Sequence, residues 1–283
     1  MAGVVFVNPE AGPGATEPAD LRVRFSGHDV EECGPEDLAG RVTAARDDEV
    51  DFVGVAGGDG SQRCVAEQLA GGDVPLLPIP AGTRNHFAKD LGIRTIEDAA
   101  TVAGGGRVER VDVGRVNGRV FLNNSSLGIY PRIVVSREAR QLRLRKGVAT
   151  VVAAVEQIRR GRRLEVDVDG ETAKAWLVFV GNGRYGEGLL DLADRESLRD
   201  GELDVRVVRA DQPLARLRVV GALLLGRLAG SPLVITRATP GLVIDVHRRR
   251  RIEVALDGEV EEMGLPLRYE CVEAALPVLI PPV

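Results

Sequence analysis

Short runs of β-branched apolar residues alternate with segments of helical periodicity along the first 100 residues of this chain. Residues 3–7 and 51–56 have the composition of buried strands, and residues 29–32 are a weaker strand candidate. Residues 35–46 combine a proline at the first helical position with apolar side chains at helical spacing, which predicts a helix. Strands that alternate with helices are typical of a parallel sheet with right-handed crossovers.

A second pattern begins after the three consecutive glycines at 104–106. Apolar segments then follow one another with turns between them, which is typical of antiparallel β structure, and two helices are expected at 147–159 and 214–228. Strands are expected at residues 108–116, 119–123, 164–168, 175–180, 203–208, 242–246 and 252–256. We therefore predict an α/β domain with a parallel sheet over residues 1–107 and a β-rich, sandwich-like domain over residues 108–283.

Two glycine-rich turns follow apolar strands of the first domain. The first is GGDGS at residues 57–61, and a helix is expected after it at 62–69; the second is PAGTRN at residues 80–85. Glycine lets the backbone come close to a ligand, and the N–H groups at a helix start attract anions. Ligands of such sheets bind at the carboxyl ends of the strands. Two such turns in one small domain predict a nucleotide site.

Composition and charge narrow the class of protein. The chain of 283 residues is 44% hydrophobic and 28% charged, as expected of a globular protein, and its net charge of -5 argues against a nucleic-acid binder. Three scattered cysteines are too few for a disulfide framework or a zinc site and fit a reducing cytoplasm. The start lacks the pattern of a signal peptide, and the most apolar helical stretch, 214–228, carries three arginines. We expect a cytoplasmic protein, peripheral to a membrane at most.

The motifs resemble those of a known family. Residues 57–61 match the GGDG[T/S] signature of the diacylglycerol-kinase-type lipid kinases, which include sphingosine and ceramide kinases, and NAD kinases have a shorter form of it. The segment PAGTRNHFAKDL at 80–91 resembles the P-x-G-T-x-N-D-[FL]-A-R segment of the lipid kinases much more than any segment of NAD kinases. Similarity continues in family order at residues 111–114, 121–128, 181–182, 200–205 and 257–259. The resemblance implies the same two-domain plan, with residues 275–283 returning to the first domain.

The resemblance also implies which residues bind ATP. The two turns would enclose its phosphates from two sides, and a side chain in the loop after the first strand would contact the adenine. That side chain belongs to Asn8, which is explained nearly as well as an asparagine of an ordinary turn. The nucleotide-binding residues implied are Asn8, Gly57, Gly58, Gly60, Ser61, Gly82, Thr83 and Asn85.

Five acidic residues are candidates for catalysis and metal binding. Asp59 would hold Mg²⁺ beside the phosphates, and the resemblance adds Asp112 to a charged network around it. Asp257 would take the proton from a lipid hydroxyl, with Glu259 on the same face of an extended segment. Asp200 resembles a ligand of a second cation. Three of these residues have a structural alternative: Asp59 as a helix cap, Asp257-Gly258 as a hairpin turn, and Asp200-Gly201 as an ordinary turn.

Three features depart from the family pattern. His86 occupies the position next to Asn85 where most of these kinases have aspartate, and residues 62–67 lack the usual Asn-Glu pair. The region 14–25 looks too short for the expected first helix.

The segment 181–186 matches G-x-G-x-x-G, but we discount dinucleotide binding because no βαβ unit surrounds it. Basic clusters at 137–146, 159–163 and 248–251 are either solvated surface or contacts with anionic headgroups, and we favour Arg140, Arg143, Arg145 and Lys146 for the latter.

The sequence thus predicts an ATP- and Mg²⁺-dependent lipid kinase whose acceptor is a diacylglycerol-like or sphingoid lipid at a membrane surface. NAD kinase and a non-catalytic nucleotide- or lipid-binding regulator are the alternatives. No nucleic-acid partner is expected, and the sequence leaves open whether the chain forms a homodimer.

Overall fold

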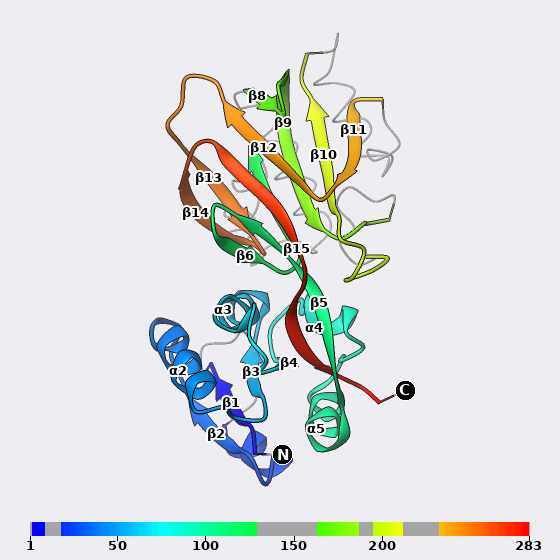
Figure 1. The fold of residues 1–283 in the computed structure, drawn as a ribbon. Coiled ribbons are helices and arrows are strands. Elements are labelled where there is room, and N and C mark those ends of the chain that lie inside the picture. Colours follow the sequence, from blue (N-terminus) through cyan, green and yellow to red (C-terminus); the bar gives the residue numbers. More distant parts are fainter. Residues whose placement is uncertain (1, 9–17, 129–162, 187–194, 212–231, 283) are drawn as a thin grey trace, which may run out of the picture. The chain divides into compact units, whose positions relative to one another are not determined.

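The computed structural model describes residues 2–8, 18–128, 163–186, 195–211 and 232–282 (Figure 1). The chain divides into two compact units. The first unit comprises Met1–Val113 and Val272–Val283, and the second comprises Gly114–Cys271. Two long strands, β5 (Arg107–Val116) and β15 (Leu267–Ile280), contribute residues to both units.

A parallel sheet with the strand order β15–β4–β3–β1–β2 forms the first unit. Strands β1, β3 and β4 are short and almost wholly buried, which explains their continuous apolar composition, whereas β2 is partly exposed. The C-terminal part of β15 joins this sheet through the pairing of Val278 with Leu76. The other strands are β1 (Val4–Val7), β2 (Asp29–Glu32), β3 (Val53–Gly57) and β4 (Leu76–Pro80).

Helices lie on both sides of this sheet, and Figure 1 shows its strands between α2 and α3 on one side and α5 on the other. Side chains of α1, α4 and α5 share one apolar core with β1 and β4, whereas α2 packs against α3 and both contact β3. The helices are α1 (Pro18–Arg24), α2 (Pro35–Asp47), α3 (Asp59–Leu69), α4 (His86–Asp90) and α5 (Ile96–Gly105).

One expectation about this unit was wrong. The region 14–25 was judged too short for a helix, yet α1 forms there with seven residues. Leu21 and Phe25 are buried in the core of the sheet, so two well-packed anchors are enough to hold a helix of two turns.

Antiparallel strand pairs build the second unit, as predicted. The central strand is β9 (Glu171–Asn182): its first half pairs with β8, and its second half pairs with β7 and β10. The remaining strands are β6 (Arg119–Phe121), β7 (Asn124–Gly128), β8 (Leu164–Val168), β10 (Leu203–Arg209), β11 (Val234–Thr239), β12 (Gly241–Val246), β13 (Arg251–Leu256) and β14 (Glu259–Gly264).

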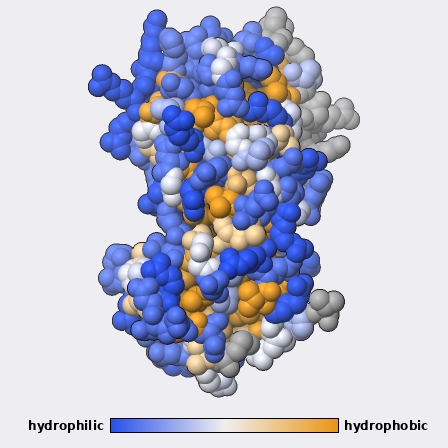
Figure 2. All heavy atoms as spheres, in the orientation of Figure 1, coloured by the Kyte–Doolittle hydropathy of each residue, from blue (hydrophilic) through white to orange (hydrophobic). Residues whose placement is uncertain are grey.

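The predicted α/β and β-rich classes are therefore confirmed. Strands β7, β11, β14 and β15 were not foreseen, and the helices expected at 147–159 and 214–228 lie outside the described residues. Figure 2 shows a surface on which hydrophilic side chains predominate and hydrophobic areas are small. Among the described residues, no helix combines the length and apolar character needed to cross a bilayer.

Candidate active site

The carboxyl ends of β1, β3 and β4 lie in register at one edge of the parallel sheet. Val7 pairs with Ala56, and Gly57 pairs with Pro80, so the segments that follow these strands begin side by side. The chain leaves β1 toward β2 and leaves β3 toward β4, so the strand order reverses between β1 and β3. Ligands of open α/β sheets bind at such a switch point.

The two predicted glycine turns touch each other at this edge. A Cβ atom placed on Gly82 would lie 2.4 Å from the Cα of Gly58, and one placed on Gly57 would lie 2.7 Å from the Ser61 side chain. Because real Cβ atoms do not approach other atoms so closely, Gly57 and Gly82 are required by local packing. The turns therefore form one surface made largely of main chain.

Asn85 fixes the shape of the second turn. It is buried in the left-handed conformation, with φ of 52°, and its side-chain amide bonds to both polar groups of Gly82. The Gly82 N–H donates to Asn85 Oδ1 at 3.0 Å, and Asn85 Nδ2 donates to the Gly82 carbonyl at 2.8 Å. This pair of bonds leaves Thr83 exposed at the tip of the turn.

The first turn leads directly into α3, which begins at Asp59. Its N-cap residue is Gly58, which supplies no side-chain cap to the first N–H groups of the helix. Gly60 and Ser61 lie in this first helical turn, and Asn8 Nδ2 donates to Ser61 Oγ at 3.5 Å. The structure thus brings the predicted residues after β1 and β3 together at the N-terminus of an 11-residue helix.

Asp59 lies beside the segment that carries His86. The main-chain N–H of His86 donates to Asp59 Oδ1 at 2.9 Å, so a family aspartate at position 86 would be next to Asp59. Burial lowers the pKa of the His86 imidazole below its usual value, although the Asp59 carboxylate acts in the opposite direction. The imidazole is therefore neutral at pH 7, and this chain has one negative charge fewer at that position.

Asp112 and Asp200, predicted for two different cation sites, each accept main-chain N–H groups in the structure. Asp112 is buried in β5 and accepts the Ala274 N–H at 2.7 Å, while Asp200 belongs to the second unit. Asp200 accepts main-chain N–H groups from Arg184 at 3.0 Å and Glu202 at 3.2 Å, as a turn residue does. No group of three or more His, Cys, Asp or Glu side chains suited to a metal occurs in the part of the chain that the structure describes.

Asp257 occupies the tight turn between β13 and β14. It has φ of 49° and Gly258 has φ of 97°, and Leu256 pairs with Glu259 across them, which is the pattern of a two-residue type I′ hairpin. The prediction that Asp257 and Glu259 share one face of an extended segment was therefore wrong. The chain reverses between them, and Glu259 is exposed at the start of β14.

The Asp257 carboxylate accepts three consecutive main-chain N–H groups. Leu122 donates to Oδ2 at 2.8 Å, and Asn123 and Asn124 donate to Oδ1 at 2.7 and 3.0 Å. Hydrogen bonds of this kind favour the ionised form of a carboxylate and fix its orientation. These three bonds orient a side chain that belongs to the turn between β13 and β14.

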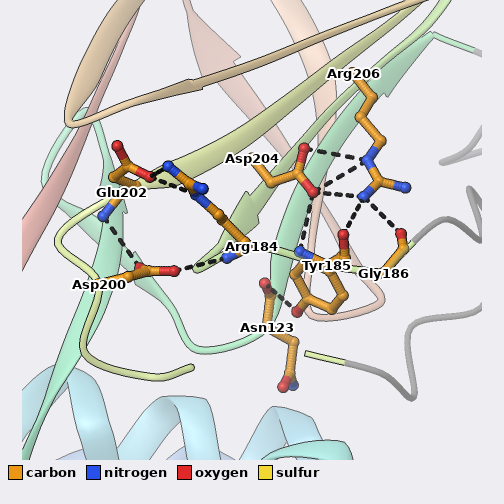
Figure 3. Close-up of polar contacts among 8 residues, drawn as sticks. All are labelled: Asn123, Arg184, Tyr185, Gly186, Asp200, Glu202, Asp204 and Arg206. Carbon is orange, nitrogen blue, oxygen red and sulfur yellow. Dashed lines mark hydrogen bonds and ion pairs between the residues drawn. The ribbon is translucent and has the colours of Figure 1, made fainter. Parts of the chain in front are cut away.

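Sequence reasoning missed a buried polar network in the second unit, part of which Figure 3 shows. Its members include Tyr185, Arg195 and the ion pair between Asp204 and Arg206, at 2.6 Å. The one available signal was the i, i+2 spacing of Asp204 and Arg206, which places opposite charges on one face of a strand. The motif at 181–186 begins with the last two residues of β9, whose strand partners are all antiparallel, so the described residues show no βαβ unit at this motif.

A parallel α/β unit with a glycine-lined carboxyl edge, continued into an antiparallel β unit, defines a kinase of the lipid-kinase and NAD-kinase class. Two family models match the chain: the diacylglycerol kinase catalytic domain over residues 2–116, and the YegS C-terminal NAD kinase beta sandwich-like domain over residues 130–280. The chain belongs to this diacylglycerol-kinase and YegS family of lipid kinases. Membership implies a nucleotide, ATP, as the phosphoryl donor.

Curated relatives support this assignment, and a solved structure shows the same fold. A protein named probable lipid kinase YegS-like from Pseudomonas aeruginosa is 31% identical, covering 80% of this chain and 75% of that protein. A diacylglycerol kinase from Mycobacterium tuberculosis is also 31% identical, covering 98% and 94%. The crystal structure of a diacylglycerol kinase from Bacillus anthracis has the same fold, with a TM-score of 0.69, 22% identity and coverage of 99% and 97%.

Proposed function

We propose that this protein transfers the γ-phosphoryl group of ATP to the hydroxyl of a membrane lipid, either diacylglycerol-like or sphingoid. The contact between the Gly58 and Gly82 turns at the switch point of the parallel sheet carries the proposal. Main-chain surfaces of this kind bind phosphate because no side chain holds the anion away from the N–H groups. The proposal that the acceptor is a lipid comes from the names of the relatives, which are named as lipid kinases and diacylglycerol kinases.

The nucleotide would lie along the edge formed by β1, β3 and β4. Gly57, Gly58, Gly60 and Ser61 would contact its phosphates at the start of α3, where the helix dipole favours negative charge. Gly82, Thr83 and Asn85 would contact the phosphates from the second turn. Asn8, next to Ser61, would contact the adenosine side.

Mg²⁺ would arrive with the nucleotide. This ion usually keeps several waters and is bound by one or two carboxylates together with substrate phosphates. Asp59, at the start of α3, fits that role, and a neutral His86 beside it is a poor ligand for a hard cation. When bound, the ion would neutralise charge that develops on the phosphoryl oxygens. Asp112 and Asp200 remain weaker candidates as ligands.

In the proposed reaction, the lipid hydroxyl oxygen forms a bond to the γ-phosphorus while the bond from phosphorus to the bridging β,γ-oxygen breaks. ADP leaves with that oxygen, and the hydroxyl proton passes to the Asp257 carboxylate. The three N–H groups that hold Asp257 would fix the orientation of its carboxylate toward the hydroxyl. Glu259, exposed after the turn, would contribute negative charge near a cation.

The test is a phosphoryl-transfer assay with γ-labelled ATP and either total membrane lipid or NAD as acceptor. We expect label in the organic extract, with the acceptor identified by the mass of the product. Label in NAD instead would establish the NAD kinase alternative. Binding of MgATP in calorimetry with no labelled product would establish the non-catalytic regulator.

The close contact of the turns predicts the effect of Gly82→Ala. The new methyl group would displace Gly58, so we expect at least a tenfold loss of ATP affinity and a stability cost of about 1–3 kcal/mol. Calorimetric titration and urea denaturation measure the two effects. Gly40→Ala is the matched control, because no atom lies within 4 Å of its added methyl group and helix α2 should gain about 0.5–1 kcal/mol. Unchanged ATP affinity in Gly82→Ala would contradict the proposed binding of ATP at the two glycine turns.

An enzyme that phosphorylates a membrane lipid also needs a surface that binds the membrane. The cluster favoured from the sequence, Arg140 to Lys146, lies outside the described residues. The turn between β12 and β13 carries Arg248, Arg249 and Arg250, and Arg251 begins β13; all four are exposed. Arg251 pairs with Glu262 at 3.1 Å, whereas the other three make no ion pair with any described residue. We propose that this turn contacts anionic headgroups.

We expect replacement of Arg248, Arg249 and Arg250 by glutamine to weaken binding to anionic vesicles by roughly two orders of magnitude. Each basic residue near such a surface contributes about 1 kcal/mol. Co-sedimentation with phosphatidylglycerol vesicles, and with neutral vesicles as reference, measures the effect. The control changes Arg22, Arg24 and Arg41 to glutamine. These three arginines pair with glutamates in the first unit, and their replacement gives a protein with the same net charge as the first triple variant. Equal loss in both triple variants would contradict a local contact.

A further inference from the structure

We infer that Tyr185, held by the buried Asp204–Arg206 ion pair, is a positioning residue for the candidate catalytic carboxylate Asp257. The inference rests on the proposed function, because it assigns Tyr185 a part in the phosphoryl transfer for which Asp257 would accept the proton. Tyr185 does not touch Asp257. It acts through the peptide groups of residues 122–124, which lie between them.

The segment 122–124 is bound on its donor side by Asp257. Its three N–H groups all point at the two oxygens of that carboxylate, and the Asp257 N–H donates back to the Asn124 carbonyl at 2.9 Å. Leu122, Asn123 and Asn124 are at most 5% exposed, so water does not replace these bonds. The position of this carboxylate therefore depends on the position of three successive peptide groups.

The acceptor side of the same segment is held by residues from elsewhere in the second unit. The Asn123 carbonyl accepts the Tyr185 hydroxyl at 2.8 Å and the Asn182 N–H at 2.9 Å. The Leu122 carbonyl accepts Arg195 Nη1 at 2.7 Å and Asn182 Nδ2 at 3.0 Å. A shift of the segment toward or away from Asp257 would stretch these bonds, so the two sides fix it together.

Tyr185 itself has little freedom to move. Its side chain is 6% exposed, its ring packs edge-on against Phe179 with centroids 5.7 Å apart, and the Arg195 guanidinium lies 5.7 Å from its centroid. The ring also lies directly over Gly181, where an added Cβ would be 2.5 Å from a ring carbon. The absence of a side chain at position 181 is what lets the tyrosine reach Asn123.

The main chain of Tyr185 is anchored by the ion pair on β10 (Figure 3). Its N–H donates to Asp204 Oδ2 at 3.1 Å, and its carbonyl accepts Arg206 Nη2 at 2.7 Å. The same nitrogen donates to the Gly186 carbonyl at 2.8 Å. Asp204 and Arg206 are 4% and 5% exposed, and their contact is a fork of hydrogen bonds rather than a single one. Both ends of the tyrosine are thus determined: its backbone by the ion pair and its hydroxyl by Asn123.

This arrangement has a chemical consequence. Transfer of the hydroxyl proton needs the carboxylate at hydrogen-bond distance from the lipid oxygen and correctly aimed, and displacements on the scale of 1 Å in an active site lower rates by about a hundredfold. Loss of the Tyr185 hydroxyl removes a bond to the Asn123 carbonyl and leaves the segment less constrained. The rate of the chemical step should then fall although ATP still binds normally.

Tyr185→Phe tests the inference, with Tyr269→Phe as its matched control. Tyr269 is also a buried tyrosine of the second unit, and its hydroxyl bonds to the Ser125 side chain at 2.9 Å rather than to a peptide group of residues 122–124. Both variants lose one buried hydroxyl, so we expect similar small losses of thermal stability. We expect kcat to fall about tenfold in Tyr185→Phe alone, with the KM for ATP unchanged in both.

A double-mutant cycle with Asp257→Ala separates positioning from a general packing effect. If Tyr185 acts through Asp257, adding Tyr185→Phe to Asp257→Ala should leave the residual rate unchanged, because the group that it positions is gone. A further tenfold loss in the double variant, or an unchanged kcat in Tyr185→Phe, would overturn the inference.

Amide hydrogen exchange supplies a readout that does not depend on activity. The N–H groups of residues 122–124 should exchange about tenfold faster in Tyr185→Phe than in the wild type, and at the wild-type rate in Tyr269→Phe. Unchanged exchange in Tyr185→Phe would contradict the link between Tyr185 and the segment even if the wild-type protein phosphorylated no lipid. Absence of lipid phosphorylation together with faster exchange would instead refute the proposed function and leave the structural link standing.

Discussion

Replacing Asp59 by asparagine is expected to lower the rate of lipid phosphorylation by about a thousandfold while leaving the fold intact. The amide can still accept the His86 N–H, so the local hydrogen bond of the turn survives. What disappears is the negative charge that would hold Mg²⁺ against the phosphates. Metal stabilisation of the transferred group is worth several kcal/mol, and each 1.36 kcal/mol corresponds to a factor of ten.

Two measurements distinguish this effect from damage to the nucleotide site. ATP binding without Mg²⁺, followed by calorimetry, should change little in Asp59→Asn, whereas the gain in affinity on adding Mg²⁺ should disappear. Asp37→Asn is the control, since Asp37 also lies in the first turn of a helix in the first unit but is exposed and far from the glycine turns in sequence. Wild-type activity in Asp59→Asn would rule out the proposed role of this carboxylate.

The corresponding change at Asp257 gives a less selective test. Asparagine there would turn an –NH₂ group toward main-chain N–H donors that now bind a carboxylate oxygen. Leaving a buried donor without an acceptor costs about 1–3 kcal/mol, so loss of activity in Asp257→Asn mixes lost chemistry with lost stability. For this reason Asp59 is the better first target, although Asp257 stands closer to the proposed proton transfer.

The parts of the site that the sequence could predict are those specified by local patterns. The glycines at 57, 58 and 82 were recognisable because each follows a buried strand, and the parallel register of β3 and β4 then brings the two turns into contact. Local sequence also suggested the hairpin at Asp257-Gly258, since this dipeptide favours positive φ at both positions. That alternative proved to describe the backbone correctly, and the catalytic role of Asp257 stays a prediction.

The remainder depends on partners that lie far apart in the chain. Tyr185 and Asn123 are separated by 62 positions, and no hydrophobic periodicity relates them. Strands β11 and β14 were missed for a related reason: most of their side chains are not buried, so they lack the apolar alternation that identifies a strand. Asp257 and Glu259 were assigned to one face because an extended segment was assumed where the chain turns back.

The two units also differ in how their candidate residues are held. In the first unit the predicted nucleotide contacts are mostly backbone, so the sequence constraint is the absence of side chains at Gly57 and Gly82. In the second unit the candidate base is a side chain, and its position is determined by a network of other side chains with buried charge. Substitutions in the first unit should therefore affect ATP affinity, whereas those in the network should affect the rate and the stability.

The largest effect on stability is expected from Arg206→Met. This change leaves the Asp204 carboxylate buried without its positive partner and removes the donor from the Tyr185 and Gly186 carbonyls. Breaking a buried pair in this way costs about 3–5 kcal/mol, because the remaining charge cannot reach water. Arg206→Lys keeps the charge but loses the planar fork, so it should fall between the wild type and Arg206→Met.

Urea denaturation of the purified variants measures these differences. The matched control is Arg209→Met on the same strand, whose guanidinium pairs with Asp211 where both side chains are about a third exposed, at 31% and 33%. Exposed pairs contribute little, so this variant should lose less than about 1 kcal/mol. Equal losses in Arg206→Met and Arg209→Met would mean that the Asp204–Arg206 pair is not buried in solution. The anchor assigned to Tyr185 would then have to be abandoned, because an exposed pair would let the 185–186 turn move independently of β10.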